Sequence, residues 1–433
     1  MKLNNILMIS YFSPPINTPA AIRVGKFANY LPAFGWKATI LTVKELDYYH
    51  NEPELFPNLK DEEIIRTNSL DPMRLLQMMK QGKQAENDLT QKLHRGGEGF
   101  TNKLKKIFPV DDKIGWLPFC WKKADKLVRQ HDFKAIYCTI GGTNAHAIAA
   151  YKISVKYKIP LLIDIRDPWA DHIFTTNIWY NKILNNYWEK KVYSQAAKLI
   201  TVTARIRTHL LKKYNFPEDK ISVIYNGYDD FSLPQNSRKD SNEIVMTFAG
   251  NMYKDISPEA FYQALADMDQ EIFADKKISL RFIGNYRNNF YQLLAEFKTT
   301  KHENIQVEVL PFMSKKELNN YLVDSDVLMI FLPQRAGSEE ILTTKLFDYL
   351  PYKKPILAFA PAAGELAEFI QNYKLGLVID AVDKQSAKER LQEFITKLSD
   401  NKLPEYSADK AILDMFHRKE LTRQLSVELE KLL

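Results

Sequence analysis

The chain has 433 residues, a formal net charge of +7, and 45% hydrophobic and 26% charged residues. These values are ordinary for a globular protein, and no apolar run approaches the roughly 18 residues that cross a bilayer, which argues against an integral membrane protein. A single hydrophobic core rarely grows beyond about 250–300 residues, so the length predicts two domains. Cys120 and Cys138 form no C-x-x-C pair, which argues against a disulfide scaffold or a structural zinc site and fits a reducing compartment.

Charge is distributed unevenly along the chain. Residues 1–235 hold 34 Lys and Arg against 23 Asp and Glu, whereas the remainder holds 26 against 30. A basic first half favours an anionic partner such as a phospholipid surface, a lipid phosphate or a nucleic acid. A basic surface that is simply solvated is the alternative.

Short β-branched runs alternate with helical stretches, which is the pattern of β-α units that build a parallel sheet. The first run precedes Pro14 and Pro15 and lacks the features of a secretion signal, so we interpret it as a strand. The strands predicted in the first half are 5–12, 37–43, 135–140, 160–166, 198–203 and 220–225. Those predicted in the second half are 244–250, 278–284, 304–310, 327–333, 355–360 and 375–380.

The expected fold is therefore α/β, with two sheets of about six strands each. We predict a first domain over residues 1–228 and a second over 243–407, joined by a polar linker rich in turn-forming residues. Residues 45–115 depart from the rhythm and predict an irregular, partly helical insertion. Residues 408–433 predict an amphipathic helix that packs toward the first domain.

The loop after the first strand, residues 13–20, runs into a helix that carries Arg23 and Lys26 near its start. Open α/β sheets bind ligands at the carboxyl ends of their strands, where helix N-termini offer free N–H groups. The loop has no G-x-G-x-x-G sequence, which argues against an NAD-dependent oxidoreductase. A turn stiffened by proline, without a ligand, is the alternative.

Residues 161–172 read L-L-I-D-I-R-D-P-W-A-D-H, so an apolar strand ends in a cluster of charged and aromatic side chains. Charged side chains at the end of a buried strand cost free energy unless they are paired with an opposite charge or bind a ligand. We expect Asp167 and Trp169 to face a ligand there. In the alternative, Arg166 pairs with a neighbouring Asp and Trp169 packs in the core.

In the second half, Gly250 closes the first strand and is followed by Asn251 and Lys254, a pattern that suits a phosphate but is weak alone. Residues 334–350 carry more chemistry. Thr343 or Thr344 can cap a helix there, with Lys345 in its first turn and Asp348 one turn further on. Such a helix start could bind a diphosphate through Lys345 and a ribose through Asp348, unless it is a plain helix cap with a surface Lys–Asp pair.

A D-x-D sequence that binds a metal ion is expected at the end of a strand. The two D-x-D sequences, residues 267–269 and 324–326, are predicted at the ends of helices and are interpreted as caps. We therefore expect no metal, because the helix start and the lysine side chains can neutralise a leaving diphosphate.

Together these segments resemble the family 4 glycosyltransferases of the GT-B fold. The resemblance rests on residues 6–41, which include Y-F-S-P-P, on I-Y-C-T-I-G-G-T-N-A-H-A-I-A at 136–149, on D-I-R-D-P-W at 164–169 and on V-I-Y-N-G-Y-D at 223–229. It covers nearly the whole chain apart from residues 45–115. It implies two Rossmann-like domains that face each other across a cleft, with the acceptor on the first and the nucleotide sugar on the second.

The family carries two acids eight positions apart, E-x7-E, at the donor site, and Glu340 and Asp348 stand at this spacing, with Asp in place of the second Glu. The resemblance implies that Glu340 contacts the transferred sugar and Asp348 the ribose. The donor-binding residues are expected to be Gly250, Asn251, Lys254, Arg335, Thr343, Thr344, Lys345 and Asp348.

Asp167 is the candidate for orienting or deprotonating the acceptor hydroxyl, beside Glu340 as the second catalytic residue. The residues expected to bind the acceptor are Pro15, Thr18, Arg23, Asn144, His146, Arg166, Trp169 and His172.

The resulting hypothesis is a retaining, metal-independent glycosyltransferase that moves a hexose-type sugar from a nucleoside-diphosphate sugar to a glycan or lipid-linked saccharide, in the synthesis of cell-surface polysaccharide or glycoconjugate. We expect it in the cytoplasm at the inner face of the membrane, in contact with anionic lipid and not with nucleic acid. A nucleotide-sugar 2-epimerase of the same fold and a non-catalytic binding subunit are the alternatives. Intact Glu340, Lys345 and Asp348 argue against the second.

Overall fold

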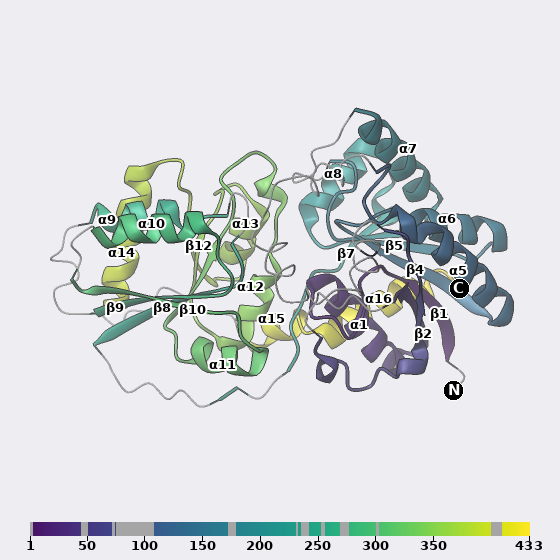
Figure 1. The fold of residues 1–433 in the computed structure, drawn as a ribbon, viewed down its shortest axis with the longest axis horizontal. Coiled ribbons are helices and arrows are strands. Elements are labelled where there is room, and N and C mark those ends of the chain that lie inside the picture. The colour runs from purple at the N-terminus through teal and green to yellow at the C-terminus, as the bar shows by residue number, and fades with distance from the viewer. Residues whose placement is uncertain are drawn as a thin grey trace, which may run out of the picture. The chain divides into compact units, whose positions relative to one another are not determined.

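The computed structural model divides the chain into two compact units. The first contains residues 1–226 and 418–433, and the second contains residues 227–417 (Figure 1). The structure describes residues 3–44, 51–71, 74, 108–171, 179–230, 233–234, 242–252, 256–268, 277–299, 303–399 and 409–433. Within these ranges, no helix is long and apolar enough to span a bilayer.

The first unit is built on a parallel sheet of seven strands in the order β3-β2-β1-β4-β5-β6-β7. The strand order reverses between β1 and β4, so loops at the carboxyl ends of these two strands flank the switch point. The strands are β1 (Asn4–Ile9), β2 (Trp36–Val43), β3 (Ile64–Thr67), β4 (Phe133–Ile140), β5 (Leu161–Ile165), β6 (Lys198–Thr201) and β7 (Ile221–Val223).

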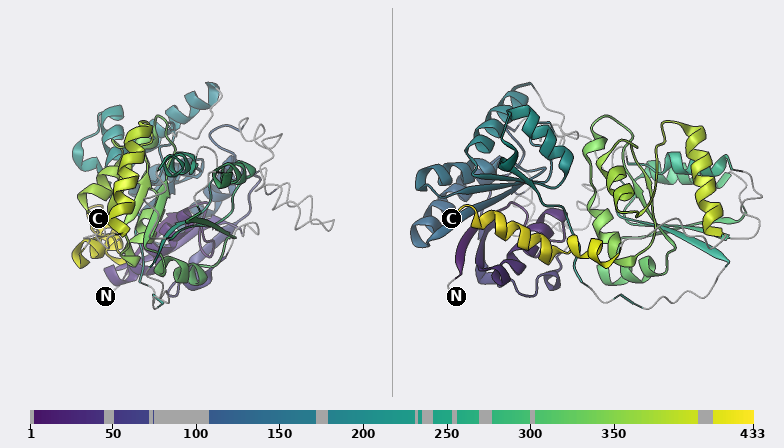
Figure 2. Two further views of the ribbon diagram at one scale, coloured as in Figure 1. Left: turned by 90° about the vertical axis from the view of Figure 1, so that its left-hand side faces the viewer. Right: turned by 180° about the vertical axis from the view of Figure 1, so that it is seen from behind.

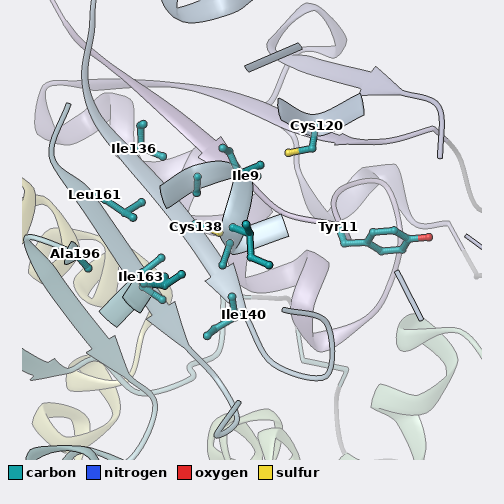
Figure 3. Close-up of a cluster of buried hydrophobic side chains, with 14 of the residues drawn as sticks. Ile9, Tyr11, Cys120, Ile136, Cys138, Ile140, Leu161, Ile163 and Ala196 are labelled. Carbon is teal, nitrogen blue, oxygen red and sulfur yellow. The ribbon is translucent and has the colours of Figure 1, made fainter. Parts of the chain in front are cut away.

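Helices cover both faces of this sheet, so β1, β4 and β5 are buried on both sides over most of their length. On one face, α5, α6 and α7 enclose a core that includes Cys120 and Cys138, whose thiols are free and whose pKa values burial raises (Figure 3). On the other face, α16 lies beside α1 and inserts three leucines into the core (Figure 2). The helices are α1 (Pro19–Tyr30), α5 (Leu117–Gln130), α6 (His146–Tyr157), α7 (Trp179–Gln195), α8 (Ala204–Tyr214) and α16 (Arg418–Glu430).

The second unit has a parallel sheet of six strands in the order β10-β9-β8-β11-β12-β13, with its switch point between β8 and β11. Aromatic and aliphatic side chains of α9, α10 and α14 build the core on one face. The strands are β8 (Glu243–Ala249), β9 (Lys277–Ile283), β10 (Ile305–Leu310), β11 (Val327–Phe331), β12 (Ile356–Phe359) and β13 (Gly376–Ile379). The helices are α9 (Glu259–Ala266), α10 (Asn288–Thr299), α11 (Lys315–Val323), α12 (Thr344–Tyr349), α13 (Glu365–Asn372), α14 (Lys384–Ser399) and α15 (Lys410–Met415).

All twelve predicted strands are present, within a few residues of their expected ends, but the prediction of about six strands in the first sheet was one short. The missing strand, β3, lies in the region expected to be an irregular insertion. It has two apolar residues followed by Arg66 and Thr67, too short a run for its periodicity to be recognised. The predicted C-terminal helix is two helices, of which α15 belongs to the second unit and α16 to the first. The predicted cap positions Asp267 and Asp324 do follow the last residues of α9 and α11.

Candidate functional site

Two segments that are far apart in the sequence meet at the switch point of the second sheet. Gly250 follows β8, and the chain after β11 passes through a short 3-10 turn, Ser338–Glu340, into α12. A Cβ atom placed on Gly250 would lie 2.3 Å from Cε and 2.7 Å from Nζ of Lys345, so the lysine side chain crosses directly over the glycine. Gly250 also has a φ of +134°, a backbone conformation that residues with a Cβ atom rarely adopt. The predicted donor residues Gly250 and Lys345 are thereby brought together.

A tyrosine holds α12 in the position that makes this contact. The hydroxyl of Tyr349 accepts a hydrogen bond of 2.9 Å from the N–H of Ala249, the last residue of β8. Thr343 caps the same helix, since its Oγ1 accepts from the N–H of Lys345 at 3.4 Å. Sequence reasoning missed Tyr349, although its spacing of four residues from Lys345 places both on one side of the helix.

The surroundings of Lys345 suit an anion. Burial lowers the pKa of its ammonium group, and the carboxylate of Asp348 partly offsets that effect. The Nζ atom lies 5.4 Å from the centre of the Phe248 ring. A partly desolvated cation at the carboxyl end of a parallel sheet is stabilised when a phosphate approaches it. The negative charge and the oxygen atoms of the phosphate compensate for the hydration that the ammonium group has lost.

The other predicted donor residues lie in the same loops. Glu340 ends the 3-10 turn, Thr344 begins α12, and both are half-buried, as is Asp348. Arg335 is exposed in the loop after β11. Asn251 is exposed and its Oδ1 accepts a 3.0 Å hydrogen bond from the N–H of Asn285, which links the loops after β8 and β9. Lys254 lies outside the described residues.

A second residue that the sequence did not single out borders this site. Gly284 follows β9, and a Cβ atom there would lie 2.3 Å from the carbonyl oxygen of Gly250 and 3.4 Å from the hydroxyl of Tyr286. The Tyr286 ring stacks on Phe290 at 4.3 Å, and its hydroxyl is buried without a hydrogen-bond partner in the described part of the chain. The Tyr286 hydroxyl is therefore a candidate contact for the substrate expected in the second unit.

In the first unit, Asp167 and Arg166 lie together at the carboxyl ends of β4 and β5. The Nη2 atom of Arg166 donates to the carbonyl of Gly141 at 2.8 Å. The Oδ2 atom of Asp167 lies 3.0 Å from where a Cβ of Gly141 would be. Asp167 is half-buried, so its carboxylate is placed at the sheet edge where a substrate hydroxyl could reach it.

The prediction that Arg23 binds the acceptor is corrected by the structure. Its Nε and Nη2 atoms donate to the two oxygens of Asp164 at 2.7 and 2.9 Å, and further bonds go to the carbonyls of Ile224 and Tyr225. Arg23 is 5% exposed and Asp164 fully buried, and Tyr137 also donates to Asp164. Burial opposes the charge on Arg23, but Asp164 outweighs it and raises the pKa of the guanidinium. The pair ties α1 to β5 and the end of β7.

Trp169 and His146 are also core residues and not acceptor contacts. Trp169 is 1% exposed, and its indole N–H donates to the Oδ1 of Asn185 at 3.0 Å, as the alternative interpretation required. The Nε2 atom of His146 lies 2.7 Å from the carbonyl oxygen of Thr139, and its ring packs on Trp116. Both assignments failed because a sequence does not reveal whether an aromatic residue after a strand turns outward or inward.

The remaining predicted acceptor residues differ in exposure. Pro15 is half-buried and Thr18 caps α1 by accepting from the N–H of Ala21. Asn144 is buried, and its backbone N–H donates to Asp111, whose pKa burial raises to about 6. His172 lies outside the described residues. Among the described residues, no His, Cys, Asp or Glu side chains form a group suited to a metal ion.

The position of His146 leads to a dependence of stability on pH. Burial lowers its pKa to about 4, whereas the unfolded chain takes up the proton near pH 6.5. The folded state therefore loses stability as the pH falls through this window, by about 2 kcal/mol at pH 5. We expect the stability difference between the wild type and His146→Gln to shift by this amount between pH 7.5 and 5. Urea unfolding followed by tryptophan fluorescence measures it, and a difference that is independent of pH would contradict it.

Two family models match the sequence and together span most of it. The model "Glycosyltransferase Family 4" matches residues 20–230, and "Glycosyl transferases group 1" matches residues 229–411. The two models meet at residues 229–230, close to the boundary between the two units of the structure, which lies between residues 226 and 227. None of the curated proteins matches the sequence significantly.

Solved structures share the fold over essentially the full chain. A glycosyltransferase from Rickettsia africae ESF-5 superposes with a TM-score of 0.64 at 14% identity, covering 100% of this chain and 99% of its own. Anabaena HepE in complex with UDP and glucose gives 0.59 at 13% identity, covering 98% and 99%. The pneumococcal O-GlcNAc transferase GtfA in complex with UDP and GlcNAc gives 0.60 at 11% identity, covering 100% and 99%.

The superpositions show that the fold is shared, and the family models show that the chain belongs to the family. Each half of the chain is matched by the glycosyltransferase model that corresponds to its unit, and the two Rossmann-like units agree with the GT-B structures. The chain therefore belongs to the family 4 type of glycosyltransferases and is a glycosyltransferase of the GT-B fold.

Proposed function

We propose that the enzyme transfers a hexose-type sugar, with retention of anomeric configuration, from a nucleoside-diphosphate sugar to a glycan or lipid-linked saccharide. The observation that carries the proposal is the passage of Lys345 over Gly250 at the switch point of the second sheet. Gly250 makes room for the side chain of the half-buried Lys345, and a cation held in this way at a strand end suits a diphosphate. Glu340 and Asp348 lie in the same segment.

In this mechanism the second unit binds the donor. Lys345 balances the negative charge that develops on the diphosphate as the bond to the sugar breaks, so no metal ion is required. Glu340 contacts the sugar, and Asp348 accepts hydrogen bonds from the ribose hydroxyls. The leaving phosphate oxygen helps to take the proton of the acceptor hydroxyl on the same face of the sugar, which leads to retention.

The first unit provides the acceptor side. Asp167 orients the acceptor hydroxyl so that its proton can pass to the leaving phosphate, with Arg166 beside it. We propose a glycan or lipid-linked saccharide of cell-surface polysaccharide or glycoconjugate synthesis as the acceptor, met on the cytoplasmic face of the membrane. UDP with glucose or with GlcNAc in the structures of HepE and GtfA supports UDP sugars as the first donors to try.

The donor proposal is tested by thermal stabilisation with a panel of nucleotide sugars, because bound donor raises the stability of the folded state. The hit is then incubated alone and with candidate acceptors, and products are identified by mass spectrometry. We expect one donor to stabilise the protein and to be consumed quickly only with acceptor. Conversion of the sugar without acceptor would instead identify a 2-epimerase.

The site assignment is tested by Glu340→Gln and Asp348→Ala, with Glu389→Gln on the exposed side of α14 as the control. We expect each site variant to lose about 100-fold or more in kcat/KM and the control to lose little. Transfer that is unchanged in both site variants would refute the assignment even if the enzyme class is correct.

A further inference from the structure

The first part of helix α7, residues 179–189, has its polarity reversed, whereas Val192 and Tyr193 near its end pack in the core. The side that packs on the first unit presents Asn181, Asn185 and Glu189, which are 4%, 1% and 1% exposed. Their hydrogen bonds are made inside the unit: Asn181 donates to the carbonyl of Phe108, and Asn185 accepts from Trp169. Glu189 accepts from a backbone N–H and from Lys213 and Tyr214. Polar groups thus occupy the side where a helix ordinarily buries apolar residues.

The opposite side of this part of α7 presents three large apolar residues to solvent. Trp179, Ile183 and Tyr187 are 74%, 61% and 53% exposed. They follow one another at intervals of four residues, so they form a continuous stripe along two turns of the helix. Lys182 borders the stripe on one side and Lys191 on the other, and Lys190 follows the stripe at its C-terminal end. An exposed stripe of this size is costly in water and marks an interaction surface.

The stripe continues across the neighbouring helices. The three helices α5, α6 and α7 lie side by side on one face of the first sheet (Figure 1). The Nζ atom of Lys191 lies 5.2 Å from the Tyr187 ring and 5.7 Å from the Tyr151 ring of α6. On the far side of α6, Lys152 lies 5.3 Å from the ring of Trp121, which is 42% exposed on α5. We call this outer surface of the three helices the α5–α7 face.

The α5–α7 face is strongly cationic. The three helices contain nine Lys and Arg residues and two carboxylates. Both carboxylates are already engaged, since Glu189 is buried and Asp125 is bound by Lys156, Arg129 and Tyr157. The surface therefore combines exposed Trp, Tyr and aliphatic side chains with uncompensated positive charge.

We propose that the α5–α7 face docks on an anionic phospholipid bilayer, with the stripe of α7 lying at the level of the headgroups. Trp and Tyr place an apolar ring against acyl chains and a polar edge against headgroups. Lysines at the border of such a helix extend toward lipid phosphates and anionic headgroups. A protein partner fits less well because lysine is depleted from the centre of protein interfaces. Nucleic acid fits less well because the exposed aliphatic side chains of Ile183 and Val155 cannot bind its phosphate groups.

The proposal is tested by co-sedimentation of the full chain with vesicles of phosphatidylcholine alone and of phosphatidylcholine mixed with phosphatidylglycerol. We expect binding that rises with the anionic fraction and weakens with salt. Trp179→Ser combined with Ile183→Ser should reduce the partition coefficient about tenfold or more. Lys182→Gln combined with Lys190→Gln should reduce it roughly tenfold at low salt.

Matched controls lie in the second unit. Tyr291→Ser removes an aromatic residue that is 49% exposed on α10, and Lys298→Gln with Lys384→Gln removes two exposed lysines. We expect both controls to bind vesicles like the wild type. Stabilisation by the nucleotide sugar should be the same in all variants, which separates loss of lipid binding from loss of the fold or of the donor site.

Tryptophan fluorescence gives a direct readout. Lipids brominated near the headgroup should quench the wild type, and Trp179→Phe should remove part of the quenching. Trp179→Phe combined with Trp121→Phe should remove most of it, because Trp36, Trp116 and Trp169 are at most 1% exposed. The proposal is overturned if the Trp179→Ser, Ile183→Ser variant binds anionic vesicles like the wild type. It is also overturned if the stripe instead supports self-association or binding to nucleic acid in the absence of lipid.

Discussion

Replacing Lys345 by Met is expected to lower kcat/KM for the nucleotide sugar by about 10²–10³-fold while the protein remains folded. Met retains the unbranched stem that crosses Gly250 and contacts Phe248, but it carries no charge for the diphosphate. Both KM and kcat should change, because the charge is needed when the donor binds and more so as the leaving diphosphate gains charge. Steady-state kinetics at fixed acceptor concentration measure the two effects.

The control for this variant is Lys316→Met, which removes an exposed lysine from α11 of the same unit. It should leave KM and kcat nearly unchanged. A Lys345→Met enzyme that binds and turns over the donor like the wild type would exclude this lysine from the diphosphate site.

The structural contact between Gly250 and Lys345 can be tested as a coupling. Gly250→Ala should weaken donor binding because its Cβ would lie 2.3 Å from the Cε of Lys345 and displace the side chain. If both changes act through the position of the ammonium group, the double variant should bind the donor about as weakly as Lys345→Met alone. Additive losses in donor affinity would show that Gly250 acts independently.

Breaking the buried pair of Arg23 and Asp164 should have the largest effect on stability. Arg23→Met leaves the fully buried carboxylate of Asp164 without its cation and is expected to destabilise the first unit by about 3–5 kcal/mol. Arg23→Met combined with Asp164→Leu removes both charges and should recover much of this loss. The difference between single and double variants reports the cost of an uncompensated buried charge.

Tryptophan fluorescence is suited to this measurement. All six tryptophans, Trp36, Trp116, Trp121, Trp169, Trp179 and Trp188, belong to the first unit, so their signal follows the unfolding of that unit. Lys134→Met, which removes an exposed partner of Asp132 on β4, is the control and should cost at most about 1 kcal/mol. Equal destabilisation by the two single variants would mean that the buried pair has no special weight.

Sequence patterns were sufficient for the framework of the fold. Strands such as β8 and β11 are continuous apolar runs because both faces of a parallel sheet are covered, and such runs stand out in a sequence. The edge strand β3 was not predicted because it has only four residues, three of them half-buried, and so contains no continuous apolar run. Edge strands need less apolar surface, so their sequences resemble loops.

The site was predicted as two separate motifs, and what joins them could not be predicted. That Lys345 crosses Gly250 depends on the register of β8 beside β11 and on the hydrogen bond from Ala249 to Tyr349, which are 100 residues apart. Arg23 and Asp164 are 141 residues apart, and their pairing likewise depends on the fold. Local spacing indicates which groups could act, whereas long-range packing decides which of them are already engaged.

The position of α16 has a consequence for the order in which the protein is made. Leu421, Leu425 and Leu429 of this helix complete the core of the first unit beside Val24 and Phe27 of α1. A ribosome releases residues 227–417 before these leucines, so the second unit can finish folding while the first still exposes an apolar groove on its sheet. We therefore expect the first unit, although its strands are made first, to complete its core only after α16 emerges from the ribosome.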